Sequence, residues 1–151
     1  MTFSSDIEKT TQEIVEEFSF FDEWLERYEY IIELGKNLKG LPDSKKDELH
    51  KVPGCQSQVW FHAMHKDERV HFEADSDAMI VRGLIAILLR VYSARTPREI
   101  LETPPEFFNV LQLGTHLSGS RANGLHAMVN RIHAYAEAFE NENKDDVELS
   151  Q

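Results

Sequence analysis

The sequence predicts a single α+β domain in which N-terminal helices precede a small antiparallel sheet, a long buried helix and a C-terminal helix. Two patterns support this class. Apolar residues recur at helical spacing before residue 40 and after residue 78, whereas residues 59–74 alternate between apolar and polar side chains. The 151 residues are 41% hydrophobic and 28% charged, and they contain no internal repeat, so one globular core is expected.

Two amphipathic helices are predicted at the N-terminal end. The first carries apolar residues at near-helical spacing after an N-cap at Ser4 or Ser5: Ile7, Ile14, Val15 and Phe18. The second follows Asp22 and Glu23, and its stripe comprises Trp24, Tyr28, Ile31, Gly35 and Leu38. Gly40 and Pro42 mark its end. The charged residues up to Lys51 predict a loop that leads into a short strand.

The alternating segment predicts a β-hairpin with a defined register. Val59, Phe61 and Ala63 share one face, and a turn at residues 66–69 pairs Ala63 with Phe72 and Phe61 with Ala74. The other face pairs Met64 with His71, His62 with Glu73 and Trp60 with Asp75. Because that second face is mixed in polarity, we expect it to be partly exposed.

Three further helical segments are predicted after the hairpin. Asp75, Ser76 and Asp77 are N-cap candidates for a helix that is apolar on nearly all sides and therefore central. The sequence Thr96-Pro97-Arg98-Glu99 has the pattern of a capping box and predicts a short helix. Pro104 and Pro105 end it, and residues 106–113 can form another.

The last predicted helix starts near Ser118 or Ser120, and its buried stripe comprises Leu125, Met128, Val129, Ile132, Ala136 and Phe139. Apolar residues become scarce after this stripe. We therefore place the domain at residues 1–140 and expect an acidic, flexible tail at residues 141–151.

The net charge of −11 disfavours binding to nucleic acids and to anionic membranes, because both carry negative phosphates. The most apolar stretch, residues 78–92, is interrupted by Arg82 and Arg90 and is shorter than the ~20 residues that span a bilayer. The N-terminus lacks the basic-then-apolar run of a secretory signal, and one cysteine cannot form an internal disulfide. A cytoplasmic protein with protein partners is expected.

The single cysteine, Cys55, follows a Pro-Gly turn signal at the junction between a loop and a strand. A loop tip can present a thiol to another protein, and Gly54 has no Cβ to obstruct a partner backbone. Free cysteines, however, usually behave as small buried hydrophobes. Position alone favours this inert role.

Four blocks of the sequence change that preference: YEYIIELGKNL, GCQSQVW, DSDAMIVRGLIAILL and SRANGLHAMVNRI. In order and spacing, from Phe18 to Ala138, they resemble the SufE-type (SufE/CsdE) sulfur-acceptor family of iron-sulfur cluster assembly. The resemblance implies a SufE/IscU-like fold. It also implies that Cys55 takes sulfur as a persulfide from a cysteine desulfurase of the SufS or CsdA type, which it stimulates, and passes that sulfur to an iron-sulfur scaffold or another acceptor.

The implied chemistry is thiol exchange, which requires no metal or cofactor in this chain, although the desulfurase uses pyridoxal phosphate. The resemblance therefore implies a persulfide carrier and not a stand-alone enzyme. A nearby second cysteine would discharge the persulfide as a disulfide, so a lone cysteine suits the role. The family further implies that the loop shelters its thiol in an apolar pocket until the partner docks, with Val59 or Trp60 nearby.

Four residues are supporting candidates for the site. Gly54 and Gln56 flank Cys55 in the motif. Arg121 matches a position that the family keeps near the cysteine, where a guanidinium can stabilise a thiolate or persulfide together with the start of the last helix. Asp77 matches the family's acidic position close to the partner surface, and it is also an N-cap candidate.

The chain departs from the family at two positions. Gly119 stands where the family often has Pro, which would loosen the start of the last helix. His50 stands where the family commonly has Asn, which changes how the cysteine loop is held and could place a titratable group near Cys55.

Three alternatives stay open. A hydrolase with Cys55 as nucleophile needs a histidine base, and the candidates are His50, His62, His65, His71, His116, His126 and His133. A metal or iron-sulfur site would combine Cys55 with His62, His65 or His71, although alternation separates His62 from His65 and clusters prefer several thiolates. The third alternative is an interaction module with an incidental cysteine.

Overall fold

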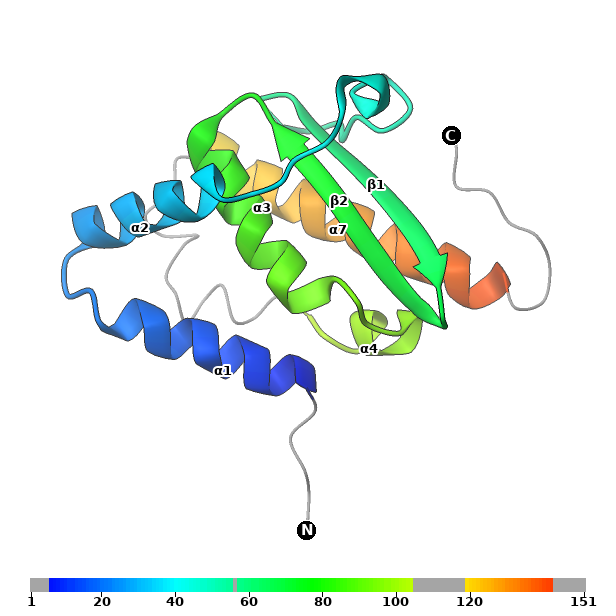
Figure 1. The fold of residues 1–151 in the computed structure, drawn as a ribbon, viewed down its shortest axis with the longest axis horizontal. Helices are drawn as coiled ribbons and strands as arrows, with labels where there is room; N and C mark the ends of the chain where they lie inside the picture. Colours follow the sequence, from blue (N-terminus) through cyan, green and yellow to red (C-terminus); the bar gives the residue numbers. More distant parts are fainter. Residues whose placement is uncertain (1–5, 56, 105–118, 143–151) are drawn as a thin grey trace, which may run out of the picture.

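A β-hairpin lies between a long C-terminal helix and an irregular segment that follows the second helix (Figure 1). The computed structural model describes residues 6–55, 57–104 and 119–142. Its elements are α1 (Asp6–Ser19), α2 (Trp24–Lys36), the 3₁₀ turn η1 (Asp43–Lys45), β1 (Val59–Lys66), β2 (Arg69–Ser76), α3 (Met79–Tyr92), α4 (Pro97–Leu101) and α7 (Gly119–Glu142). The α+β class predicted from the sequence is confirmed.

Several expectations fall outside this part of the chain. They are the N-caps at Ser4 and Ser5, the helix at residues 106–113 and the tail beyond Glu142, where α7 ends. None of the helices in the described ranges combines the length and hydropathy needed to cross a bilayer.

The hairpin has the predicted register. Ala63 pairs with Phe72 and Phe61 with Ala74 in the antiparallel ladder. The two turn residues, Asp67 and Glu68, both have positive φ, 54° and 67°. Two consecutive positive φ values are typical of a type I′ turn, which matches the right-handed twist of the strands and fixes their register.

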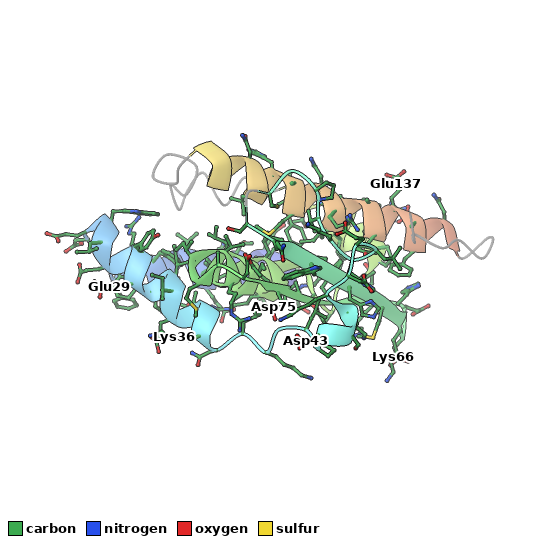
Figure 2. All side chains as sticks on the ribbon, turned by 90° about the horizontal axis from the view of Figure 1, so that it is seen from above. Glu29, Lys36, Asp43, Lys66, Asp75 and Glu137 are labelled. Atoms are coloured by element: carbon green, nitrogen blue, oxygen red, sulfur yellow. The ribbon has the colours of Figure 1, made fainter. Side chains whose placement is uncertain are left out.

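One end of the mixed face of the hairpin is more buried than the sequence predicts. Trp60 and Asp75 were expected at a partly exposed surface, but they are only 8% and 4% exposed. The segment after α2 covers them, because Lys46 lies 5.6 Å from the centre of the Trp60 ring and 3.2 Å from Asp75. Arg82 also pairs with Asp75. Figure 2 shows Asp75 towards the middle of the molecule, whereas the other end of this face is open at Met64.

The central helix α3 is buried on most sides, as predicted, and packs against α1, α2 and β2. Its contact with α2 depends on glycine. A Cβ on Gly83 would lie 2.0 Å from the carbonyl oxygen of Ile31, so α2 and α3 approach at a distance that only glycine allows. Arg90 and Glu17, joined at 2.8 Å, tie α3 to α1.

The predicted N-cap of α3 is wrong. Ala78 occupies the cap position, and no side chain caps it. Asp75 instead accepts hydrogen bonds from the N–H groups of Leu41 and Ser76. Asp77 accepts from Gln58 at 3.0 Å. Both acidic N-cap candidates therefore accept hydrogen bonds from other main-chain N–H groups and do not cap α3.

The two remaining helices agree with the sequence. Thr96 and Glu99 form the predicted capping box, which begins α4. In α7 the stripe Leu125, Met128, Val129, Ile132 and Ala136 is buried, and Phe139 packs at its edge. In both views α7 runs along the face of the hairpin opposite to the segment after α2 (Figures 1 and 2).

Candidate functional site

The loop that carries Cys55 is closed at its base by main-chain pairing. The N–H of Val52 donates to the carbonyl of Val59 at 2.8 Å, and the N–H of Phe61 donates to the carbonyl of His50 at 2.8 Å. Lys51 and Trp60 form an antiparallel bridge between these bonds. Residues 50–52 therefore pair with β1 only through this isolated bridge and form no strand of their own, and the loop of residues 53–58 projects from it.

The tip of the loop rests on α7. The thiol of Cys55 donates to the carbonyl of Gly124 across 3.7 Å, and its side chain is half-buried against the core. A Cβ on Gly124 would lie 3.5 Å from the Cys55 Sγ. Gly54 has φ of +90°, and a Cβ there would lie 3.4 Å from the Cβ of Ala127. Small residues on the helix thus let the loop pack directly on it.

Burial raises the pKa of the Cys55 thiol above its ordinary value of 9.0. Because the thiolate is the nucleophile in sulfur exchange, a protonated and half-buried thiol is poorly reactive at neutral pH. The resting loop therefore holds Cys55 in a protected form. Val59 and Trp60 are both buried where the loop joins β1.

Asp77 fixes the exit of the loop. Its carboxylate accepts from the N–H of Gln58 at 3.0 Å, and its own N–H donates to the carbonyl of Gln58 at 3.3 Å. This reciprocal pair connects the end of the cysteine loop to the start of α3. The structure thus places Asp77 at the loop as a main-chain clamp and not as a helix cap, and its place near a partner surface stays a prediction.

Two of the candidate residues cannot be placed. Gln56 lies outside the described residues. Arg121 lies in the first turn of α7, which begins at Gly119, but its side chain is outside the described part. Its contribution to thiolate or persulfide stability stays a prediction.

Sequence reasoning missed two residues of α7 that hold the base of the loop. The guanidinium of Arg131 donates to the carbonyl of Lys51 at 2.8 Å, and the hydroxyl of Tyr135 donates to the carbonyl of Phe61 at 3.2 Å. The Arg131 guanidinium also lies 5.7 Å from the centre of the Tyr135 ring. Helical periodicity identifies apolar faces, and it carries no signal for a partner that is a distant main-chain carbonyl.

The histidines near β1 have other partners. His50 Nδ1 lies 2.7 Å from the carboxylate of Asp47, and His50 Nε2 lies 3.3 Å from His62 Nδ1. Burial, assisted by the charges of Lys45 and His50, lowers the pKa of His62. His65 lies on the other face of β1, 5.1 Å from the Phe139 ring, so alternation separates it from His62 as predicted.

Within the described ranges, no three His, Cys, Asp or Glu side chains gather into a set that could hold a metal ion. The partner of the Cys55 thiol there is a main-chain carbonyl. That contact shelters a thiol, whereas a hydrolase would require an imidazole in its place.

Comparison with known proteins agrees with this arrangement. Residues 12–136 match the SufE family, described as an Fe-S metabolism associated domain. An uncharacterised SufE-like protein of Rhizobium meliloti is 45% identical over 130 residues, which is 83% of this chain and 93% of the relative. One of Rhizobium etli is 46% identical over 125 residues, covering 80% of this chain and 84% of the relative.

The fold also matches a solved structure. The solution structure of a hypothetical protein from Thermus thermophilus aligns with a TM-score of 0.70 at 23% identity. The alignment covers 85% of this chain and 93% of that protein, so the likeness extends over the whole domain. At this identity it supports the fold alone. The family match and the two relatives assign the function class: the chain belongs to the SufE family and has a role in iron-sulfur metabolism.

Proposed function

We propose that this chain is a sulfur acceptor for a cysteine desulfurase, carrying sulfane sulfur as a persulfide on Cys55 and delivering it for iron-sulfur cluster assembly. One observation carries the proposal. The lone cysteine of a SufE domain lies in a loop that is hydrogen-bonded at its base and packs on α7 at its tip, where the hydrogen bond from the thiol is a weak 3.7 Å contact. This arrangement supports the proposal, because a partner that displaces the tip from α7 would expose the thiol.

The first transfer is a displacement at sulfur. The Cys55 thiolate attacks the terminal sulfur of the persulfide on the desulfurase, a new S–S bond forms, and the desulfurase cysteine leaves as a thiolate. The proton of the Cys55 thiol passes to solvent or to a partner base. In the second transfer an acceptor thiolate attacks the terminal sulfur, and Cys55 leaves as a thiolate. Oxidation states balance in each step, so no external oxidant is needed.

The resting geometry suits a carrier that must avoid reaction with other molecules. In a reducing cytoplasm, where we place this protein, free thiols would discharge an exposed persulfide. The half-buried position of Cys55 would shelter a persulfide there from such exchange. Docking of the desulfurase would supply the free energy that moves the tip away from Gly124 and exposes the thiol.

The experiment measures alanine release by a SufS-type desulfurase from cysteine, with and without this chain. The wild type should increase turnover, and Cys55→Ser should abolish the increase while melting at the same temperature. An increase that survives in Cys55→Ser would identify an interaction module and contradict the carrier. Hydrolysis of an ester or amide that depends on Cys55, without any effect on the desulfurase, would favour the hydrolase.

A further inference from the structure

We infer that Arg131, supported by Tyr135, is a positioning residue that anchors the base of the cysteine loop to α7 and thereby sets how far Cys55 can reach during sulfur transfer. The inference rests on the proposed function and adds to it a residue outside the cysteine motif. It assigns to α7 a second task besides burying the hydrophobic core.

Four residues of α7 that meet the loop and its base lie on one side of the helix. Gly124, Ala127, Arg131 and Tyr135 follow one another at intervals of three or four residues, which places them in a single stripe. The two small residues lie beside the tip, against Cys55 and Gly54. The two long residues reach the base of the loop, at Lys51 and Phe61.

The contacts at the two ends of this stripe differ in strength. At the tip, the thiol is a weak donor, and its bond to the Gly124 carbonyl is 3.7 Å long. At the base, a charged guanidinium donates to the Lys51 carbonyl at 2.8 Å, and hydrogen bonds to charged groups are about twice as strong as neutral ones. The tip can therefore leave α7 while the base remains in place.

Tyr135 gives the anchor its second point. Its side chain is 6% exposed, its hydroxyl donates to the carbonyl of Phe61, and its ring lies beside the Arg131 guanidinium. Lys51 lies in the bridged segment that enters the loop, whereas Phe61 lies on β1, which leaves it. The pair thus ties both sides of the base of the loop to one helix.

This anchor defines where the loop can bend. Between the fixed residue Val52 and Cys55 there are only Pro53 and Gly54, and Gly54 has the positive φ that other residues rarely adopt. Movement of the tip is therefore restricted to a short segment, and Cys55 swings about a fixed point. Without Arg131 the entry segment would still pair with β1 but would lose its direct tie to α7, so the base of the loop could shift on the helix and carry Cys55 with it.

The test begins with the chain alone, by measuring the rate at which iodoacetamide alkylates Cys55. Arg131→Ala should increase this rate about tenfold, the factor expected from losing a hydrogen bond to a charged group. Arg131→Lys retains a donor and should lie between this variant and the wild type. Arg98→Ala is the matched control, because it removes an exposed guanidinium from α4. Its rate should equal that of the wild type.

The second measurement is sulfur transfer from the desulfurase at saturating carrier. Arg131→Ala should lower kcat although its thiol is more accessible, and its circular dichroism spectrum should be unchanged. A rate of alkylation within twofold of the wild type would overturn the inference. Should Arg131→Ala fail to fold, Tyr135→Phe decides, with an expected increase in alkylation of about fivefold and an overturning result of no increase.

The sulfur-transfer measurement tests the proposed function, and the alkylation measurement tests this inference separately. If the wild type accepts no sulfur from a desulfurase, the carrier proposal fails. The alkylation rates still decide whether Arg131 holds the loop, since they require no partner.

Discussion

Gly124 lies where the cysteine loop packs on α7, and replacing it by alanine tests whether the thiol is sheltered there. A Cβ at this position would lie 3.5 Å from the Cys55 Sγ, 3.8 Å from its Cβ and 3.9 Å from its Cα. All three distances are ordinary van der Waals contacts, so the methyl group fits without moving the loop. The substitution also removes a glycine from a helix, where alanine is better by about 1 kcal/mol.

The Gly124→Ala substitution should have two effects, one on stability and one on the reactivity of Cys55. The free energy of unfolding should rise by about 1 kcal/mol, which for a chain of this size raises the melting temperature by about 2–4 °C. The methyl group buried against the docked tip contributes about 0.8 kcal/mol, which should slow alkylation of Cys55 about fourfold. Scanning calorimetry measures the first effect, and intact-protein mass spectrometry during iodoacetamide treatment measures the second.

Gly54→Ala provides the opposite control on the same loop. Its φ of +90° is unfavourable for alanine, although its Cβ would make only an ordinary contact with the Cβ of Ala127 at 3.4 Å. We expect a loss of stability of about 1 kcal/mol or more and faster alkylation. If Gly124→Ala lowered the melting temperature or accelerated alkylation, the placement of Cys55 against α7 would be refuted.

Three further predictions concern the core and the pH dependence. Gly83→Ala should destabilise the domain by about 3 kcal/mol or more, because its Cβ would collide with the Ile31 carbonyl; urea unfolding that matches the wild type would contradict the close contact between α2 and α3. Burial raises the pKa of Asp75, but its hydrogen bonds and the nearby cations outweigh this effect and hold the pKa below its ordinary value. The stability that Asp75 provides is therefore complete above its unfolded pKa of about 4 and is lost as pH falls through the lower folded pKa. Asp75→Asn should cost about 3 kcal/mol at neutral pH, because Arg82 and Lys46 lose their carboxylate partner, and should flatten the acid side of the stability profile; an unchanged acid profile would refute this. The pH midpoint for alkylation of Cys55 should lie above that of the urea-unfolded chain, because burial raises its pKa, and an equal or lower midpoint would disagree with a half-buried thiol.

The hairpin shows what the sequence can determine. Alternation excludes a slip of one residue, because it would move the apolar side chains of one strand to the other face, and the two-residue turn at Asp67 and Glu68 fixes the register. The capping box at Thr96 is equally local, since its donors and acceptors lie within four residues. Elements whose partners lie nearby in the chain were therefore predicted correctly.

The errors occur where a distant segment competes for a local group. Asp77 has the position of an N-cap, but Gln58 takes its carboxylate. Trp60 looks like a residue of an open sheet face, but Lys46 covers it. Arg131 has no local signature, because its acceptor is the main chain of Lys51, 80 residues away. Such pairings depend on how the segments pack, which periodicity does not describe.

The site was predicted in part by position and in part by resemblance. A Pro-Gly turn before Cys55 indicated a loop, and the structure places the cysteine there, but the same turn gives no information about the helix beneath it. The contact with Gly124 joins residues 69 positions apart. Only the fold could show that the thiol rests on α7.

The most direct test of the central claim is the mass of Cys55 after incubation with a cysteine desulfurase and cysteine. The account predicts a gain of one sulfur atom on the peptide that contains Cys55, which is removed by a reducing thiol and is absent from Cys55→Ser. A desulfurase that turns over normally in the presence of this chain while Cys55 gains no sulfur would contradict the account.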